Sequence, residues 1–208
     1  MSNELILYTH PMSRGRTVRW ILEEIGQPYQ TELLEYGTTM KSAEYLAINP
    51  MGKVPALKHG DMVITESAAI CAYLADAFPE AGLAPALNDP KRGLYYKWLF
   101  FMAGPLEAGM INQAIGVKLE EEQKKMVGYV GVDEMLNMLE ETLAQNTYLL
   151  GESFSVADIY IGAFLGWMLH SKMMPPREVF VRYVEHLYAR PAAIRASQID
   201  DALLAGQQ

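Results

Sequence analysis

Cysteine is almost missing from this sequence. Of its 208 residues only Cys71 carries a thiol, so no disulfide can form within the chain. Residues 1–4 (MSNE) contain no basic side chain and lead into no long apolar run, unlike a secretory signal peptide. Structural disulfides, in turn, are typical of secreted domains. We therefore expect a cytoplasmic protein.

Basic residues are few and scattered. The sequence has 17 Lys and Arg against 25 Asp and Glu, a net charge of −8, and no basic run that could neutralise a line of phosphates. A nucleic-acid partner is therefore not expected. The most apolar stretch, residues 159–169, is too short to cross a bilayer, which argues against a membrane protein. The four histidines show no metal-ligand spacing, so we predict no metal site.

The sequence is half apolar, which is enough to form a core, and it opens with the pattern of a strand, a helix and a strand. An apolar run at residues 5–8 predicts a buried strand. Apolar residues at helical spacing over 18–25 predict a helix that stops at Gly26. Alternation over 29–33 predicts a second strand. This order of elements implies that the two strands pair in parallel.

A hairpin and a second helix follow. Residues 54–58 and 62–65 flank His59-Gly60-Asp61, which is a hairpin signal, and a helical pattern starts at Ser67. The resulting order, βαβ-ββα, is that of a thioredoxin-like α/β domain, which we assign to residues 1–78.

Residues 79–90 form the predicted domain boundary. They hold three prolines and a glycine, so they cannot form one helix. No strand pattern follows them. The helical patterns beyond the boundary cover residues 91–116, 120–145, 156–171 and 177–189. Pro105 is expected to kink the first of these helices. The sequence thus predicts a linker at 79–90 and an all-α C-terminal domain at 91–208.

Four short motifs carry a family resemblance. They are Pro11-Met12-Ser13 at the first strand-to-helix turn, NPMGKVPAL at 49–57, ESAAI at 66–70 and SVAD at 155–158. The last is a helix capping box, which we assign to folding. In this order and with these gaps the motifs are specific. On them the sequence resembles the cytosolic glutathione S-transferases, of bacterial type with a serine-type active site, over nearly the whole chain. It matches no single class.

The resemblance implies an enzyme with glutathione as co-substrate. It would conjugate the glutathione thiolate to small apolar electrophiles. It would pair as a homodimer through its third helix and the helix carrying Trp98 and Phe101. Two alternatives stay open, because a fold does not fix a function. One is glutathione-dependent peroxidase or isomerase activity with the same thiolate. The other is a non-catalytic binding or interaction protein on this fold.

The resemblance also implies a set of glutathione contacts. In the family the Val-Pro bond of the second motif is cis, and Val54 turns its backbone toward the tripeptide, which pairs as an added strand. Glu66 would face the ammonium group of glutathione. Ser67 would bind the γ-glutamyl carboxylate at a helix N-terminus, unless it is a plain helix cap. Lys41 and Lys53 are candidates for the glycine carboxylate, or else lysines that face solvent.

Ser13 is the expected catalytic residue. The reaction needs a thiolate, and a hydroxyl that donates a hydrogen bond to sulfur favours the charged form. Ser13 stands where serine-type members of the family carry that hydroxyl; otherwise it only caps the helix. Tyr8 is the rival donor. It lies one residue from the position that tyrosine-type members use, and a one-residue shift turns a strand side chain to the other face. We therefore predict a packing role for Tyr8.

The electrophile contacts are less clearly marked. Met12 adjoins Ser13, and Met110 lies on the kinked helix beyond Pro105. Flexible thioethers suit a tolerant apolar pocket, which we expect between the Ser13 turn and the kinked helix around Pro105, although ordinary core is the alternative for Met110. Cys71 lies on the apolar face of the third helix. We expect it to be a buried small side chain and not a nucleophile for thiol exchange.

Overall fold

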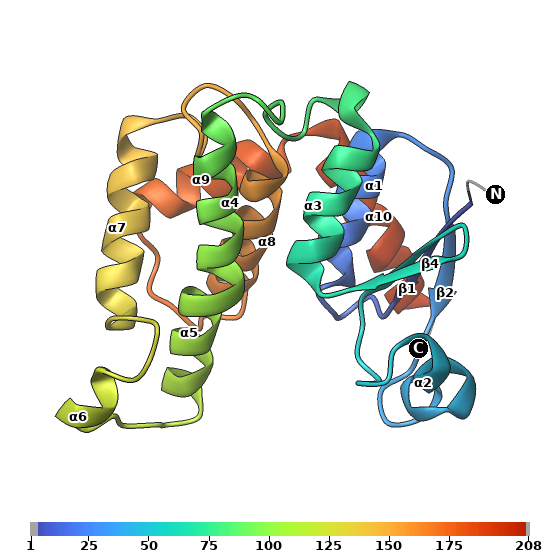
Figure 1. Cartoon of the computed structure of the whole chain (residues 1–208), viewed down its shortest axis with the longest axis horizontal. Helices are drawn as coiled ribbons and strands as arrows, with labels where there is room; N and C mark the ends of the chain where they lie inside the picture. The colour runs from blue at the N-terminus through green and yellow to red at the C-terminus, as the bar shows by residue number, and fades with distance from the viewer. Residues whose placement is uncertain (1–3, 207–208) are drawn as a thin grey trace. The chain divides into compact units, whose positions relative to one another are not determined.

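The computed structural model describes residues 4–206, which divide into two compact units (Figure 1). The first unit consists of the chain up to Gly82 together with the segment from Leu187 onward. The second unit runs from Leu83 to His186. The first unit contains a sheet with helices, and the regular elements of the second unit are helices. The predicted fold class, a thioredoxin-like α/β domain followed by helices, is confirmed.

A four-stranded sheet forms the basis of the first unit. Its strands are β1 (Leu5–Thr9), β2 (Gln30–Leu33), β3 (Ala56–His59) and β4 (Met62–Thr65). Their order across the sheet is β2-β1-β3-β4. β1 pairs with β2 in parallel and with β3 antiparallel, while β3 and β4 form the predicted hairpin. The parallel pairing deduced from the strand-helix-strand order is therefore confirmed.

Helices α1 (Gly15–Ile25), α2 (Ala43–Ile48), α3 (Ser67–Ala77) and α10 (Pro191–Ala205) belong to this unit. α1 ends, as predicted, at a left-handed Gly26 with φ 71°. α2 lies in a stretch for which the sequence predicted no helix. Its six residues are too few to display a helical period. The Ser42 side chain caps it by accepting a hydrogen bond from the Tyr45 N–H at 3.3 Å.

The last helix, α10, runs alongside α1 (Figure 1). The sequence analysis assigns residues 91–208 to a single helical domain, and the last helical pattern that it identifies ends at residue 189. Pro191 occupies the first turn of α10, where a missing N–H costs nothing. The buried residues of this helix are small or charged: Ala192, Ala193, Ala196 and Asp200. Because they lack large apolar side chains, the sequence shows no clear apolar stripe there.

The helices after the boundary are α4 (Lys91–Phe101), α5 (Glu107–Ala114), α6 (Glu121–Lys124), α7 (Val132–Gln145), α8 (Val156–His170) and α9 (Glu178–Tyr188). The irregularity predicted at Pro105 takes the form of a π-helical turn, Met102–Leu106, between α4 and α5. The helix predicted over 120–145 is interrupted between α6 and α7, where Gly128 and Gly131 lie. None of the helices described between residues 4 and 206 combines the length and apolar character needed to cross a membrane.

Asp158 organises the start of α8, where the predicted capping box is confirmed. Its carboxylate accepts hydrogen bonds from the Ser155 N–H at 2.8 Å and the Ser155 hydroxyl at 3.0 Å. It also accepts from the Leu149 N–H and the Tyr183 hydroxyl, both at 2.8 Å. Burial raises the pKa of Asp158, and these hydrogen bonds oppose the rise. One side chain thus joins three segments of the second unit.

Replacing Asp158 with Ala should therefore destabilise the protein severely. The change leaves at least three buried donors without an acceptor, and each costs about 1–3 kcal/mol, so we expect a loss of at least about 3 kcal/mol. Urea unfolding followed by circular dichroism measures it. The control is Asp133→Ala on α7, a side chain that is 90% exposed and should change stability by less than about 0.5 kcal/mol. Equal losses in the two variants would contradict the role of Asp158.

Candidate active site

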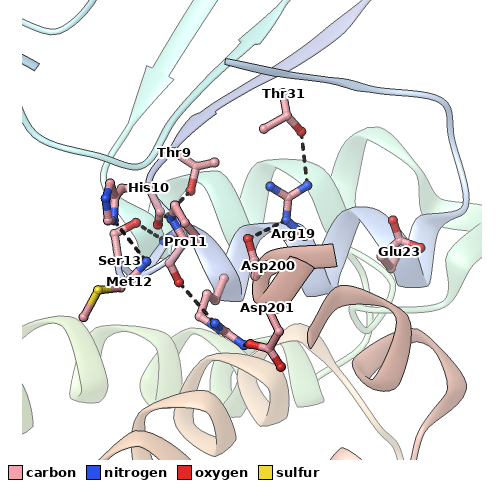
Figure 2. Close-up of polar contacts among 12 residues, drawn as sticks. Thr9, His10, Pro11, Met12, Ser13, Arg19, Glu23, Thr31, Asp200 and Asp201 are labelled. Atoms are coloured by element: carbon pink, nitrogen blue, oxygen red, sulfur yellow. Dashed lines mark hydrogen bonds and ion pairs between the residues drawn. The ribbon is translucent and has the colours of Figure 1, made fainter. Parts of the chain in front are cut away.

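The turn between β1 and α1 is held by its own hydrogen bonds (Figure 2). The Ser13 N–H donates to the carbonyl of His10 at 2.9 Å. The Met12 N–H donates to Nδ1 of the His10 ring at 3.1 Å. Thr9 and His10 are buried, whereas Met12 is 72% exposed. The turn therefore holds Ser13 in a defined place and leaves the methionine beside it open to solvent.

The Ser13 hydroxyl takes part in the helix start and keeps its own proton available. Its Oγ accepts a hydrogen bond from the Gly15 N–H at 3.0 Å. A hydroxyl has one donor and two acceptor positions. In the part of the chain that the structure describes, the Ser13 O–H donates to no acceptor. The contact with Gly15 and ligand binding therefore do not compete, because the first uses an acceptor position and the second would use the proton.

Gly15 lets α1 approach β1 closely. A Cβ at this position would overlap Oγ1 of Thr9 and come within 2.8 Å of Thr9 Cβ. Thr9 is fully buried at the end of β1, so it has no room to move away. The contact sets how far the N-terminus of α1, and with it Ser13, lies from the sheet.

His10 is a residue of the turn whose importance the sequence analysis missed. Its Nδ1 accepts from the Met12 N–H, so in the neutral ring the proton is on Nε2, which lies 3.5 Å from Oε2 of Glu35. The ring also packs on Tyr36 at 4.6 Å between centroids. The signal in the sequence that could have indicated these contacts of His10 is the predicted parallel pairing of β1 and β2. It brings the residues that follow both strands to the same edge of the sheet.

Tyr8, the rival of Ser13, lies on the other face of β1. Leu5, Leu7 and Thr9 alternate with it and are buried on the face that α1 approaches. The Tyr8 ring packs against Tyr45 of α2 at 5.8 Å between centroids. Burial, followed by the charges of Glu32 and Glu4, raises the pKa of its phenol.

A second segment precedes β3. The Val54–Pro55 peptide bond is cis, and β3 begins only at Ala56. Within residues 4–206 neither the N–H nor the C=O of Val54 has a hydrogen-bond partner. The preceding carbonyl, that of Lys53, is held firmly: the Tyr45 hydroxyl donates to it at 2.6 Å and the Asn49 amide at 2.8 Å. A fixed backbone with an unpaired donor and acceptor is suited to pair with a peptide.

The two candidate lysines differ in their surroundings. Nζ of Lys41 donates to the carbonyls of Met51 and Gly52 at 3.1 and 3.0 Å, so this lysine supports the loop before β3. Two of its three donors are used, and one is left for a ligand. Lys53 is exposed. Both lysines therefore adjoin the loop that carries Val54.

The third segment is the start of α3. Glu66, just before the helix, is exposed and has φ 68° and ψ 116°, an unusual backbone conformation for a residue with a side chain. No side chain caps the helix. Helix geometry leaves the N–H groups of its first turn, from Ser67 onward, without intrahelical acceptors. These groups and the helix dipole favour an anion here.

The sheet register brings the three segments together. Tyr8 on β1 pairs with Ala56 on β3, and Ala56 pairs with Thr65 on β4. The turn that contains Ser13 follows β1, Val54 precedes β3, and Glu66 follows β4. Since β3 runs antiparallel to both neighbours, all three segments leave the sheet at one end. A thiol held by the backbone of Val54 would lie near a hydroxyl donor at this end.

The remaining candidates, Met110 and Cys71, are buried. Met110 on α5 is buried within the second unit, at 9% exposure. Cys71 is fully buried, and burial raises the pKa of its thiol far above the usual value, as expected of a packing residue. Among the described residues no group of three or more His, Cys, Asp or Glu side chains is placed to hold a metal ion.

Comparisons with known proteins show which family the chain resembles. The family models described as "Glutathione S-transferase, N-terminal domain" and "Glutathione S-transferase, C-terminal domain" match residues 3–76 and 94–191. The curated glutathione S-transferase GstA of Escherichia coli O157:H7 is 30% identical over 164 residues, which are 78% of this chain and 78% of that protein.

Solved structures of similar proteins cover nearly the whole chain. A glutathione transferase from Methylococcus capsulatus is 30% identical and has a TM-score of 0.80 over 95% of this chain and 99% of its own. A sphingomonad glutathione S-transferase solved in complex with glutathione is 27% identical. Its TM-score is 0.78, over 94% of this chain and 98% of its own.

The close contact at Gly15 generates a prediction. Gly15→Ala should destabilise the protein by about 1–3 kcal/mol, because the added methyl overlaps a buried side chain. Gly93→Ala in α4 is the matched control. No atom lies within 4 Å of a Cβ built there, so we expect a gain of about 0.5–1 kcal/mol. Urea unfolding of both variants tests the pair, and a Gly15→Ala protein as stable as the parent would refute the contact.

Proposed function

The chain belongs to the glutathione S-transferase family, so it is a transferase with glutathione as co-substrate, and we propose that it transfers the glutathione thiolate to small apolar electrophiles. The observation that carries the proposal is the convergence of three features at one end of the sheet. They are the available hydroxyl proton of Ser13, the unpaired backbone of Val54 and the uncapped start of α3.

Glutathione matches these features along its length. Its cysteinyl backbone would pair with the N–H and C=O of Val54 as a short antiparallel strand. Its γ-glutamyl carboxylate would accept from Ser67 and the first N–H groups of α3, and its ammonium group would face Glu66. Its glycine carboxylate would lie toward Lys41 and Lys53. Each end of the tripeptide thereby meets a group of opposite charge.

Ser13 is the proposed catalytic residue. The Gly15 N–H donates to its oxygen, which polarises the hydroxyl toward donation, and sulfur would be the acceptor. Tyr8 remains the less favoured donor because it lies on the face of β1 opposite Thr9. For the electrophile we propose Met12, which is exposed beside Ser13, and Met110 in the second unit.

Thiolate formation alone accounts for little of the rate. Lowering a thiol pKa from about 8.5 to about 6.5 raises the thiolate fraction at pH 7 roughly 25-fold. Nucleophilicity then falls roughly 6- to 10-fold, so the net gain is only about 3-fold. Most of the acceleration must come from holding the electrophile near sulfur and from stabilising charge in the transition state.

We also propose that the protein is a cytoplasmic homodimer. On α4 the large apolar side chains exposed to a partner are Leu94 at 49%, Tyr96 at 37% and Phe100 at 71%. Trp98, by contrast, is buried in the second unit, and Phe101 is half-buried.

Peroxidase or isomerase activity would use the same thiolate, and no observation favours it over conjugation.

Binding is tested first. Calorimetry with millimolar glutathione should give a measurable heat with the parent protein. Glu66→Ala should weaken binding by about 1–3 kcal/mol, roughly 5- to 150-fold in Kd, because it removes the carboxylate that faces the ammonium group. Glu80→Ala is the control, an exposed acidic residue in the segment after α3, and should leave the Kd unchanged. If the parent releases no heat, the proposed function fails.

The role of Ser13 is tested by the ultraviolet thiolate band of the bound complex against pH. Ser13→Ala should raise the pKa of bound glutathione by about one to two units, since a hydrogen bond to a charged group contributes about 1.5–3 kcal/mol. Affinity should change little, because most contacts lie at Val54 and α3. Tyr8→Phe should leave the titration unchanged. The reverse pattern would transfer the role to Tyr8.

A further inference from the structure

α1 and the segment that contains α10 carry complementary charges in antiparallel order. Basic residues at the start of α1 face acidic residues late in α10, and acidic residues at the end of α1 face basic residues around the start of α10. The four ion pairs are Arg16–Asp201 at 2.7 Å, Arg19–Asp200 at 2.9 Å, Glu23–Arg195 at 3.0 Å and Glu24–Arg190 at 2.7 Å. These four ion pairs fix the position of α10 along α1.

One of these pairs is buried and sets the register. The side chains of Arg19 and Asp200 are each 1% exposed, and Arg19 Nε donates to Asp200 Oδ1 (Figure 2). Nη1 of Arg19 also donates to the Tyr29 hydroxyl and to Oγ1 of Thr31, both at 3.1 Å. Separating a buried pair would leave a charge without a partner, which is very costly. Asp200, and with it Asp201, is therefore held in place.

The neighbouring pair reaches the active-site turn. Nη2 of Arg16 donates to Asp201 Oδ1, and Nη1 of the same guanidinium donates to the carbonyl of Pro11 at 3.2 Å. Pro11 lies two residues before Ser13. A guanidinium is a planar fork, so fixing one arm on Asp201 orients the other arm. The chemistry of the turn does not itself require α10. Nevertheless, the Pro11 carbonyl of the turn is held by Arg16, which is in turn held by Asp201 of α10.

We propose that Asp201 is a positioning residue of the transferase reaction: it orients Arg16, which holds the Pro11 carbonyl and so keeps the Ser13 hydroxyl at the glutathione sulfur. The proposal rests on the proposed function and extends it to the C-terminal helix. Asp201 touches neither glutathione nor electrophile in this scheme. Its side chain is 64% exposed and that of Arg16 is 36% exposed, so the pair adds little to stability. The effect of the pair is on the position of the Pro11 carbonyl and, through it, of Ser13.

Asp201→Asn is the test, because it removes the charge and keeps the shape. Looser positioning of Ser13 should raise the pKa of the bound thiol by up to about one unit. Below that pKa the thiolate fraction then falls up to about 10-fold while its nucleophilicity rises about 3-fold, so kcat/KM falls roughly 3- to 4-fold. Above the pKa of the variant both proteins carry the thiolate, so the loss should give way to a gain of up to about 3-fold. The Kd for glutathione, measured by calorimetry, should stay within about 2-fold of the parent value, since the contacts at Val54, Glu66 and Ser67 are untouched.

Arg195→Gln is the matched control. It breaks a partly exposed ion pair between the same two helices, with Glu23 at the far end of α1 from the turn. It should leave both the thiol pKa and kcat/KM unchanged. Asp201→Glu restores the carboxylate and should recover most of the parent pH profile.

The outcomes distinguish a failure of the proposed function from a failure of the positioning role. A parent protein that binds no glutathione overturns the proposed function. A parent that binds and conjugates, with an Asp201→Asn variant of identical pH profile, overturns only the positioning role. Equal losses at all pH values in Asp201→Asn and Arg195→Gln would show that α10 acts through stability alone and would also overturn it.

Discussion

The candidate site depends on one row of paired backbone across the sheet. Tyr8, Ala56 and Thr65 are joined through the antiparallel ladders of β1, β3 and β4. These ladders fix the end of the sheet at which the chain leaves β1, enters β3 and leaves β4. A slip by one residue would turn the buried side chains of a strand to the other face. The burial of Leu7 and Leu57, both at 0% exposure, opposes such a slip. Core packing thus determines where the polar groups of the site converge.

Features carried by local patterns were predictable from the sequence. The run at 5–8, the helical spacing over 18–25 and the hairpin around Gly60 each specify an element through a few neighbouring residues. Other features were not predictable because their partners are distant or small. The six-residue α2 is too short to show a period, and α10 buries alanines that give no apolar stripe. The contacts of His10 with Glu35 and Tyr36 depend on how two strand ends meet, which only the register specifies.

The polar groups of the first unit divide into two kinds by burial. Arg19 and Asp200 are removed from water, so their attraction is strong and their separation is costly. Arg16 and Asp201 adjoin them but remain partly in solvent, where an ion pair directs a side chain more than it stabilises a fold. The buried pair provides a rigid base, and the exposed pair uses it to direct a hydrogen bond to the turn. In the scheme that we propose, the contact between α1 and α10 thereby influences the position of the Ser13 hydroxyl.

The return of α10 to the first unit has a consequence for the order of folding. Arg19 and Asp200 are 181 positions apart in the sequence, and the whole second unit lies between them. During synthesis the sheet and α1 are made long before α10, so the Arg19–Asp200 pair cannot form until the whole second unit has been made. The first unit, although most of its sequence precedes the second, can therefore be completed only after the sequence of the second unit.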